Sequence, residues 1–442
     1  MAEVSFFVWG DTLHRRNILK VGATLLTTSF LPQKLSGNTL MNNTHNKMAN
    51  DVAKDEAFWN VVAGYYDKAQ GIVNLEHGYW GKMSLPVVNA FEQHTRHVNQ
   101  QSAYYVRKQF AQDFAEATKQ VADSLAVQPN EVALTRNASE SFVNIITQYN
   151  DFQPGDTVMW ADTDYPGFQD VMGWLVTERK LNKVKITIPT RANEQELLAL
   201  YRDYLEKHPK TKLLLLTHVC NQHGLMFPVK EITAMARAKG IDVVCDCAQS
   251  WGLIDFKIED LGVDWAVFNL HKWIGSPIGV GALYMKSGTW HKVDPFPGQP
   301  EGNDSVANRV DLATSDFASF LTVPDALAFR ASIGEKNIEE RLRYLRSLWV
   351  TEAEKLPAIE VLGASNEASS SGMGAFRIKG KTSQEEVSKL QSIMETEFGI
   401  FTVARHGMDT GSCVRVTPHM CTKIEEIHQL IGALKVLNER FE

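Results

Sequence analysis

Two stretches of this chain, DVVCDCAQS at residues 242–250 and WAVFNLHKW at residues 265–273, decide its fold. Each contains a short hydrophobic run that is followed by polar side chains. Such a run, four to five residues long and without polar alternation, is typical of a strand buried on both faces. Ligands of open parallel sheets bind beyond the carboxyl ends of the strands. We therefore expect the polar residues that end these two runs to lie together at one edge of a sheet.

The same pattern extends outward over residues 121–285, where short apolar runs alternate with amphipathic stretches. This alternation indicates βα units and an α/β fold with a mostly parallel sheet flanked by helices. We expect six strands, each buried on both faces, at residues 157–160, 184–188, 213–217, 242–245, 265–268 and 281–285. Helices are expected at 194–208 and 229–239, with Gly240 ending the second of these.

The pattern changes after Pro324 to a long charged helix at 335–356, followed by β, α, β, β and α segments that end in a helix at 424–441. This order predicts a smaller α+β domain at the C-terminus. We divide the chain into residues 1–50 (signal and linker), 51–85 (a segment packing on the small domain), 86–330 (the large domain) and 331–442 (the small domain).

Composition narrows the class of protein. With 442 residues and 44% hydrophobic content, the chain is long enough for two cores. Its 45 basic and 52 acidic residues give a formal charge of −7 with no basic block, which disfavours nucleic acid as a partner. The five cysteines include no CxxC pair, so we expect reduced thiols and no metal site.

The N-terminal sequence HRRNILK at residues 14–20 precedes a modest apolar run at 21–31. That run is too short to span a bilayer, so no stable membrane anchor is expected. The segment resembles a twin-arginine export signal, which would place the protein in the periplasm. The alternative is a basic patch on a frayed terminus of a cytoplasmic protein.

Lys272 and Asp246 form the pair that carries the chemical prediction. Lys272 follows a hydrophobic strand, where its amine can be neutral and nucleophilic. Asp246 ends the preceding strand, 26 residues earlier, so one βα unit brings both to the same edge of the sheet. A nucleophilic lysine and a carboxylate for a pyridine nitrogen are what pyridoxal 5'-phosphate (PLP) requires. We predict a Schiff base of PLP on Lys272.

A phosphate group also needs backbone donors at a helix N-terminus. The turn LTRNASES at residues 134–141 opens an amphipathic helix and places Ser139 in its first turn. A plain capping sequence is the alternative interpretation of this turn.

The run from Asp246 through Lys272 resembles the class V aminotransferase family of fold-type I PLP enzymes, and within it the isopenicillin N epimerase-like branch. The resemblance covers roughly residues 70–435 and implies a homodimer with active sites shared between subunits. It implies that the cofactor is bound by Lys272, Asp246, Gln249, Asn137, Ala138, Ser139, Tyr165, Asn221, Asn269, His271 and Thr314, the last reaching the phosphate of the other subunit. It implies further that an amino-acid substrate is bound by Arg415 through its carboxylate, and by His77, Tyr79 and Trp80 around its side chain.

Several reactions share removal of the Cα proton by the freed lysine. Return of the proton to Cα gives an epimerase or racemase, its delivery to the cofactor gives an aminotransferase, and loss of a β-substituent gives a C-S lyase. A cysteine desulfurase is disfavoured, because no cysteine occurs between Cys247 and Cys413 to act from a mobile loop. We favour an epimerase-like or aminotransferase-like enzyme, with a lyase as the alternative and a non-catalytic PLP-binding protein as a weaker one.

Overall fold

The computed structural model describes residues 48–300, 305–311 and 313–442. The predicted export signal and almost all of the predicted linker lie outside these residues. Asn50, expected in the linker, belongs to the short helix α2 (Ala49–Ala53). Within the described part of the chain, no helix combines the length and the hydrophobicity needed to cross a membrane.

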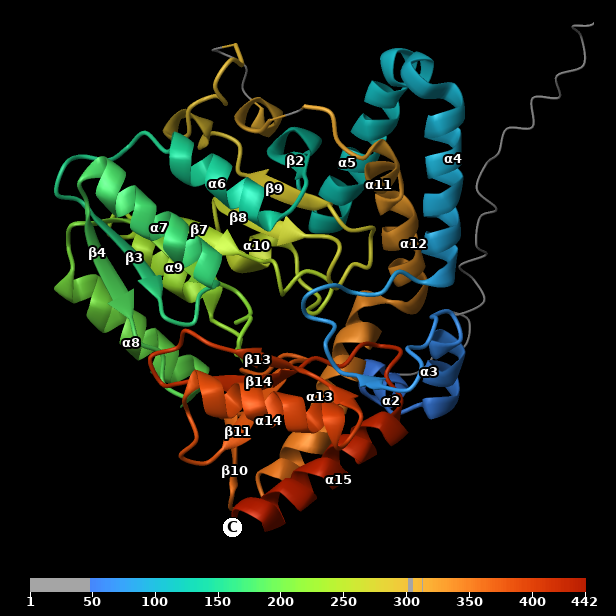
Figure 1. The fold of residues 1–442 in the computed structure, drawn as a ribbon. Helices are drawn as coiled ribbons and strands as arrows, with labels where there is room; N and C mark the ends of the chain where they lie inside the picture. Colours follow the sequence, from blue (N-terminus) through green and yellow to red (C-terminus); the bar gives the residue numbers. More distant parts are fainter. Residues whose placement is uncertain (1–47, 301–304, 312) are drawn as a thin grey trace, which may run out of the picture. The chain divides into compact units, whose positions relative to one another are not determined.

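A seven-stranded sheet forms the centre of the large domain (Figure 1). All neighbouring strands are parallel except at β9, which runs antiparallel to both of its neighbours. All six predicted strands match the structure to within two residues at each end. The strands in spatial order are β2 (Val132–Thr135), β9 (Gly281–Met285), β8 (Trp265–Asn269), β7 (Asp242–Asp246), β6 (Thr211–Thr217), β3 (Thr157–Ala161) and β4 (Asn182–Ile186).

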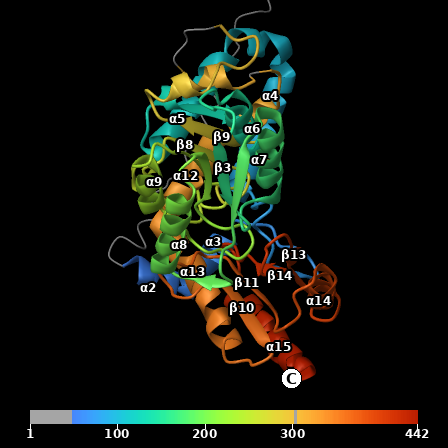
Figure 2. The same cartoon turned by 90° about the vertical axis from the view of Figure 1, so that its left-hand side faces the viewer.

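Helices cover both faces of this sheet, as Figure 2 shows. On one face, α6 (Ala138–Gln148) and α7 (Pro166–Arg179) pack on side chains such as Val244 and Val267. On the other, α5 (Phe110–Leu125), α8 (Glu194–Lys207) and α9 (Val229–Arg237) pack on residues such as Val243 and Phe268. Because neighbouring residues of one strand point to opposite faces, both hydrophobic layers require apolar residues throughout the strand.

The prediction of burial on both faces was wrong for the strand expected at 184–188. Among the described residues, β4 lies at the edge of the sheet and pairs with β3 alone. Lys183 and Lys185 of this strand are exposed. An edge strand has one hydrogen-bonded neighbour, and exposed lysines there discourage pairing with other chains.

The turn that ends the helix expected at 229–239 contains Gly240, as predicted. Gly240 has a left-handed φ of 72°, and the N–H of Ile241 donates to the carbonyl of Ala236 at 3.1 Å. This is the Schellman arrangement, which glycine adopts without steric cost.

The small domain follows α11 (Phe317–Leu321) and α12 (Val323–Ile333) and begins with the long helix α13 (Glu335–Ala353). Its sheet has the order β13-β14-β11-β10-β5, with β5 (Arg191–Ala192) supplied by the large domain. The segment after α13 contains five strands, two more than the predicted order of β, α, β, β and α. The remaining elements are β10 (Ile359–Ala364), β11 (Gly374–Ile378), α14 (Gln384–Thr396), β12 (Ile400–Phe401), β13 (Val403–Arg405), β14 (Cys413–Val416) and α15 (Ile424–Phe441).

The segment before residue 85 contacts the small domain at several points. β1 (Val73–Asn74) pairs in parallel with β12, and Arg341 of α13 forms an ion pair with Glu56 of α3 (Glu56–Ala63). The long helix α4 (Leu85–Lys108) then leads into α5. Helix α12 runs across the predicted boundary at residue 330, so the domain limits stay predictions.

Candidate active site

A cavity of about 340 Å³ lies beyond the carboxyl ends of β7 and β8, bounded on its other side by β13 and β14. Most of the residues predicted for the site line this one cavity. They are Lys272, Asp246, Gln249, Asn137, Ala138, Ser139, Tyr165, Asn221, Asn269, His271, Arg415, Tyr79 and Trp80. The individual roles assigned to them remain predictions.

Lys272 lies three residues beyond β8, in a turn covered by the loop at residues 74–81. The N–H of Gly81 donates to the carbonyl of His271 at 3.0 Å, and a Cβ at Gly81 would stand 1.7 Å from the Lys272 carbonyl oxygen. Only glycine permits this approach. Burial lowers the pKa of the Lys272 amine to about 8; Asp246 opposes this change, whereas Arg415 and Arg405 add to it.

Asp246 ends β7 and is 5% exposed. The N–H of Ala248 donates to Asp246 Oδ1 at 2.8 Å, which fixes the carboxylate at the edge of the sheet. Burial raises the pKa of this carboxyl group, while the Ala248 hydrogen bond and the charge of Lys272 act in the opposite direction. This geometry places the Asp246 carboxylate where it can face a cationic ring nitrogen.

Gln249 connects the turn of Lys272 to the loop at 74–81. Its Nε2 donates to the carbonyl of Gly78 at 2.8 Å, and its Oε1 accepts a hydrogen bond from Trp273 Nε1 at 2.8 Å. The indole N–H can only donate, so this contact also orients the amide. Gln249 thereby stabilises the wall of the cavity.

The N-terminus of α6 forms a further wall. Asn137 caps the helix through Oδ1, which accepts from the N–H of Glu140 at 2.8 Å, and Asn269 Oδ1 accepts from the N–H of Ala138 at 2.8 Å. Gly281 lies beneath, where a Cβ would stand 2.5 Å from the Asn137 carbonyl carbon. Ser139 follows in the first turn, at a helix end that attracts anions.

Three further predicted residues complete the cofactor side of the cavity. His271 Nδ1 lies 3.0 Å from the Val280 carbonyl, and burial, with the charge of Lys272, lowers the pKa of the imidazole to about 4. Asn221 is 6% exposed, and its Oδ1 is buried without a hydrogen-bond partner among the described residues. Tyr165 is 40% exposed and packs edge-on against Phe168.

Arg415 is 2% exposed and lies on β14. Its Nη1 donates to the carbonyl of Asn221 at 2.7 Å, and its Nη2 donates to Glu76 Oε1 at 2.5 Å. Glu76 belongs to the loop at 74–81, whose backbone is also bonded to Thr417. The predicted substrate arginine therefore already holds a carboxylate of its own chain.

The structure places two predicted residues outside this cavity. His77 is 3% exposed and lines a separate small cavity beside Lys82 and Cys421, where burial lowers the pKa of its imidazole to about 3. Its backbone N–H donates to Thr417 Oγ1 at 2.8 Å, and His77 does not line the cavity of Lys272, so a contact between His77 and the substrate is not supported. Thr314 lines a different cavity with Phe110 and Phe317. Its predicted contact concerns a second subunit and stays a prediction.

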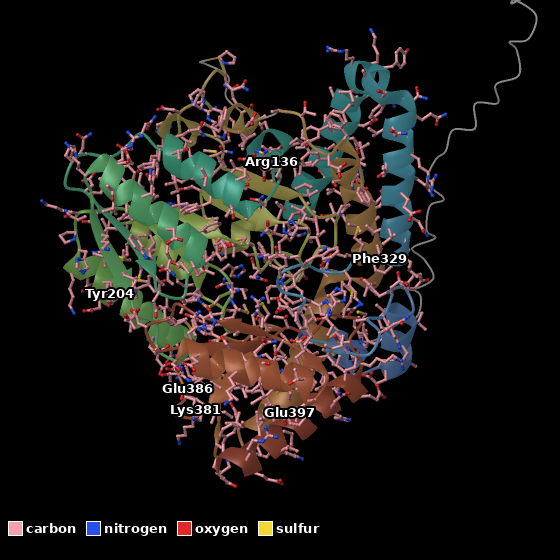
Figure 3. The ribbon with its side chains drawn as sticks, in the orientation of Figure 1. Arg136, Tyr204, Phe329, Lys381, Glu386 and Glu397 are labelled. Carbon is pink, nitrogen blue, oxygen red and sulfur yellow. The ribbon has the colours of Figure 1, made fainter. Side chains whose placement is uncertain are left out.

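Sequence reasoning missed three charged residues near the site. Arg136, at the junction of β2 and α6 (Figure 3), lines the cavity and pairs with Glu140. Arg405 of β13 also lines the cavity. Glu76 does not line it but forms an ion pair with Arg415, which does. Arg405 shares a face with Arg415 only through the register of β13 and β14, and nothing in the local sequence indicates that Glu76 pairs with a residue 339 positions away.

The sequence profile of the Aminotransferase class-V family matches residues 83–430. The chain belongs to this family. Isopenicillin N epimerase of Streptomyces clavuligerus is 23% identical over 401 residues, which cover 86% of this chain and 98% of that protein. These findings confirm the family inferred from the Asp246 to Lys272 run.

Solved structures agree on the fold. An apo structure of the cysteine desulfurase from Thermococcus onnurineus NA1 matches with a TM-score of 0.73 and 20% identity, over 83% of this chain and 95% of that one. A structure of C-DES with glycine covalently linked to its PLP cofactor matches with a TM-score of 0.73 and 21% identity, over 83% of this chain and 96% of that one. The α/β class predicted from the sequence is confirmed.

This class V chain is a PLP-dependent enzyme, and its residues fit the cofactor. A buried amine at Lys272 suits the aldehyde, the buried carboxylate of Asp246 suits the pyridine nitrogen, and the N-terminus of α6 suits the phosphate. The unpartnered Oδ1 of Asn221 is a further buried polar atom at this cavity.

Proposed function

We propose that Lys272 holds PLP covalently and also moves the proton at Cα of an amino-acid substrate. The observation that carries this proposal is the burial of the Lys272 amine, which lowers its pKa to about 8 in a cavity shared with Asp246 and three arginines. Bound PLP supplies an electron sink for negative charge at Cα. A lysine with a pKa near neutrality serves as the base, because an appreciable fraction is unprotonated at working pH.

The fate of the proton defines the reaction. We favour its return to Cα, which gives an epimerase or racemase, or its delivery to the cofactor, which gives an aminotransferase. The likeness to isopenicillin N epimerase over most of both chains supports the first of these. The arginines of β13 and β14 lie on the substrate side, where a carboxylate would be oriented.

A C-S lyase is the second candidate, because the fold also matches the cystine C-S lyase C-DES with a TM-score of 0.73.

The positions of the cysteines disfavour desulfurase chemistry. All five cysteines lie outside the lining of the cavity, and Cys413 is fully buried within β14. A strand position holds its sulfur in place, so it cannot travel to a substrate.

Exchange of the Cα proton tests this proposal directly. The holoenzyme is incubated in D2O with a panel of L- and D-amino acids and S-conjugates, followed by NMR, product chirality, and assays for keto acids. Exchange with inversion indicates an epimerase, exchange with keto-acid formation an aminotransferase, and pyruvate from an S-conjugate a lyase. Lys272→Ala should lower exchange by at least about a thousandfold. The control Lys286→Ala, at an exposed site, should exchange normally. No exchange with any substrate would contradict the proposal.

We further propose a homodimer that shares active sites, exported by the twin-arginine route to the periplasm. Thr314 lies away from the Lys272 cavity of its own chain, and Tyr79 and Trp80 are 78% and 46% exposed at that cavity, which supports completion by a second chain. Light scattering measures whether the protein associates into a dimer.

Fractionation of cells that express an Arg15→Lys, Arg16→Lys variant tests export by the twin-arginine route, and a cytoplasmic wild-type protein would contradict this route.

A further inference from the structure

Two turns that carry residues of the cofactor side lie in direct backbone contact. The Asp246 turn (residues 246–254) follows β7 and includes Gln249, and the Lys272 turn (residues 270–276) follows β8. Gly252 has a left-handed φ of 88°, and a Cβ at this position would stand 2.8 Å from the Trp273 carbonyl carbon. Glycine is therefore required where the two backbones meet. A shift of one turn would displace the other.

Arg330 of α12 binds both turns through one guanidinium group. Its Nη1 donates to the carbonyl of Trp273 at 2.6 Å, and its Nη2 donates to the carbonyl of Gly252 at 2.6 Å. Trp273 follows Lys272 directly in the chain. The planar guanidinium holds its donors in a fixed geometry, so the two carbonyls are kept at a fixed separation. Arg330 itself is not among the described residues that line the cavity.

The surroundings of Arg330 show what this side chain contributes. It is 1% exposed, and its Nε and Nη2 donate to Glu335, the first residue of α13, at 3.1 and 2.5 Å. A buried cation is costly unless it is paired and hydrogen-bonded, and here Glu335 and the two carbonyls meet that condition. An apolar side chain could fill the same volume without this desolvation cost. The distinct contribution of the arginine is the link between the two turns.

The positions of these turns determine the surroundings of the Lys272 amine. Burial is the main cause that lowers the pKa of this amine, and Asp246 acts in the opposite direction. Both effects depend on where the Lys272 turn lies relative to the Asp246 turn. The other charged or titratable groups around the amine come from several elements: His271 of the same turn, Arg136 at the junction of β2 and α6, Arg405 of β13, Arg415 of β14, and Glu76 of the loop at 74–81.

We propose that Arg330 is a positioning residue, which holds the Lys272 turn against the Asp246 turn and so keeps the amine buried beside Asp246. Because Arg330 lies outside the cavity, it acts through the backbone of Trp273 and Gly252 rather than on the reacting atoms. This inference rests on the proposed function for the role of Lys272 as the residue that holds PLP.

Arg341 of α13 supplies a matched control. It is also 1% exposed, donates to the carbonyls of Ala53 and Thr422 at 3.0 and 3.4 Å, and forms an ion pair with Glu56. Arg330→Met and Arg341→Met therefore each remove a buried guanidinium that binds two carbonyls and one carboxylate. Both variants should unfold at a lower temperature than wild type, by similar amounts. Only Arg330→Met should change the active site.

The pH dependence of PLP attachment to the apoprotein, followed by stopped-flow absorbance, is the first readout. Wild type and Arg341→Met should both level off near pH 8, where the Lys272 amine loses its proton. In Arg330→Met the loosened turn admits water to the amine, so the plateau should move up by about one pH unit and attachment at pH 7 should slow about tenfold. Arg330→Lys keeps the positive charge but lacks the planar fork, so its plateau should lie between those of wild type and Arg330→Met.

Amide hydrogen exchange of the apoprotein is the second readout and needs neither cofactor nor substrate. Peptides that cover residues 246–254 and 270–276 should exchange at least about tenfold faster in Arg330→Met than in Arg341→Met.

Three results would overturn the inference. They are an unchanged plateau in Arg330→Met, equal changes in Arg341→Met, and a wild-type plateau in Arg330→Lys, which would assign the effect to charge alone. If wild-type protein forms no bond to PLP at Lys272, the proposed function fails, and the exchange comparison still decides whether Arg330 holds the two turns.

Discussion

The two sides of the cavity are built in different ways. The cofactor side comes from consecutive βα units of one sheet, with Asp246, Asn269 and Lys272 all placed by adjacent strands. The substrate side joins the loop at 74–81 to β13 and β14 through the buried pair of Glu76 and Arg415. A sheet fixes the first side, whereas the second depends on an ion pair between distant segments. Changes on the two sides should therefore have different consequences.

After Lys272 itself, the largest effect is expected on the cofactor side, at Asp246. Asp246→Asn removes the charge that faces the ring nitrogen and should lower Cα exchange about a hundredfold, the range typical of one lost electrostatic contact in an active site. Exchange rates at saturating PLP measure this. Asp170→Asn, an exposed site on α7, is the control and should match wild type. Unchanged exchange in Asp246→Asn would remove Asp246 from the chemistry.

The pH dependence of PLP attachment tests the environment of Lys272. Only the neutral amine attacks the aldehyde. With a pKa of about 8 the rate in the apoprotein should rise about tenfold per pH unit below pH 8 and level off above it. Because Asp246 raises the pKa of Lys272, Asp246→Asn should move the plateau to lower pH. Stopped-flow absorbance follows the reaction, and a rate that still rises at pH 10 would show an ordinary, solvated lysine.

The smallest effect is expected on the substrate side, at a thiol. Cys413 lies two residues from Arg415, and burial raises the pKa of its thiol to about 12, so it is neither ionised nor mobile. Cys413→Ala should keep turnover within about twofold of wild type. Loss of turnover while the protein stays folded by circular dichroism would restore desulfurase-type chemistry.

The sequence predicted the cofactor side well because its information is local. The runs ending at Asp246 and Asn269 have strand character along their whole length, and sheet topology then brings their ends together. The strand expected at 184–188 shows the limit of this reasoning. It lies within two residues of its predicted place, but its position at the edge of the sheet leaves Lys183 and Lys185 exposed, so it is not buried on both faces.

The substrate side could be predicted only in part. The motif around Arg415 indicated a role, but the contact with Glu76 that occupies this residue depends on how the loop at 74–81 lies against Thr417. His77 was misplaced for the same reason, since neighbouring residues of one loop point into different cavities. Arg405 was overlooked because its alternation with Arg415 becomes visible only in the register of β13 and β14.

Reduction of the holoenzyme with borohydride, followed by peptide mapping, tests the central claim most directly. The account predicts one pyridoxyl group on the peptide that contains Lys272, and no label in Lys272→Ala. A label on another lysine, such as Lys82 directly after the loop at 74–81, or no label in a folded, PLP-saturated protein, would contradict it.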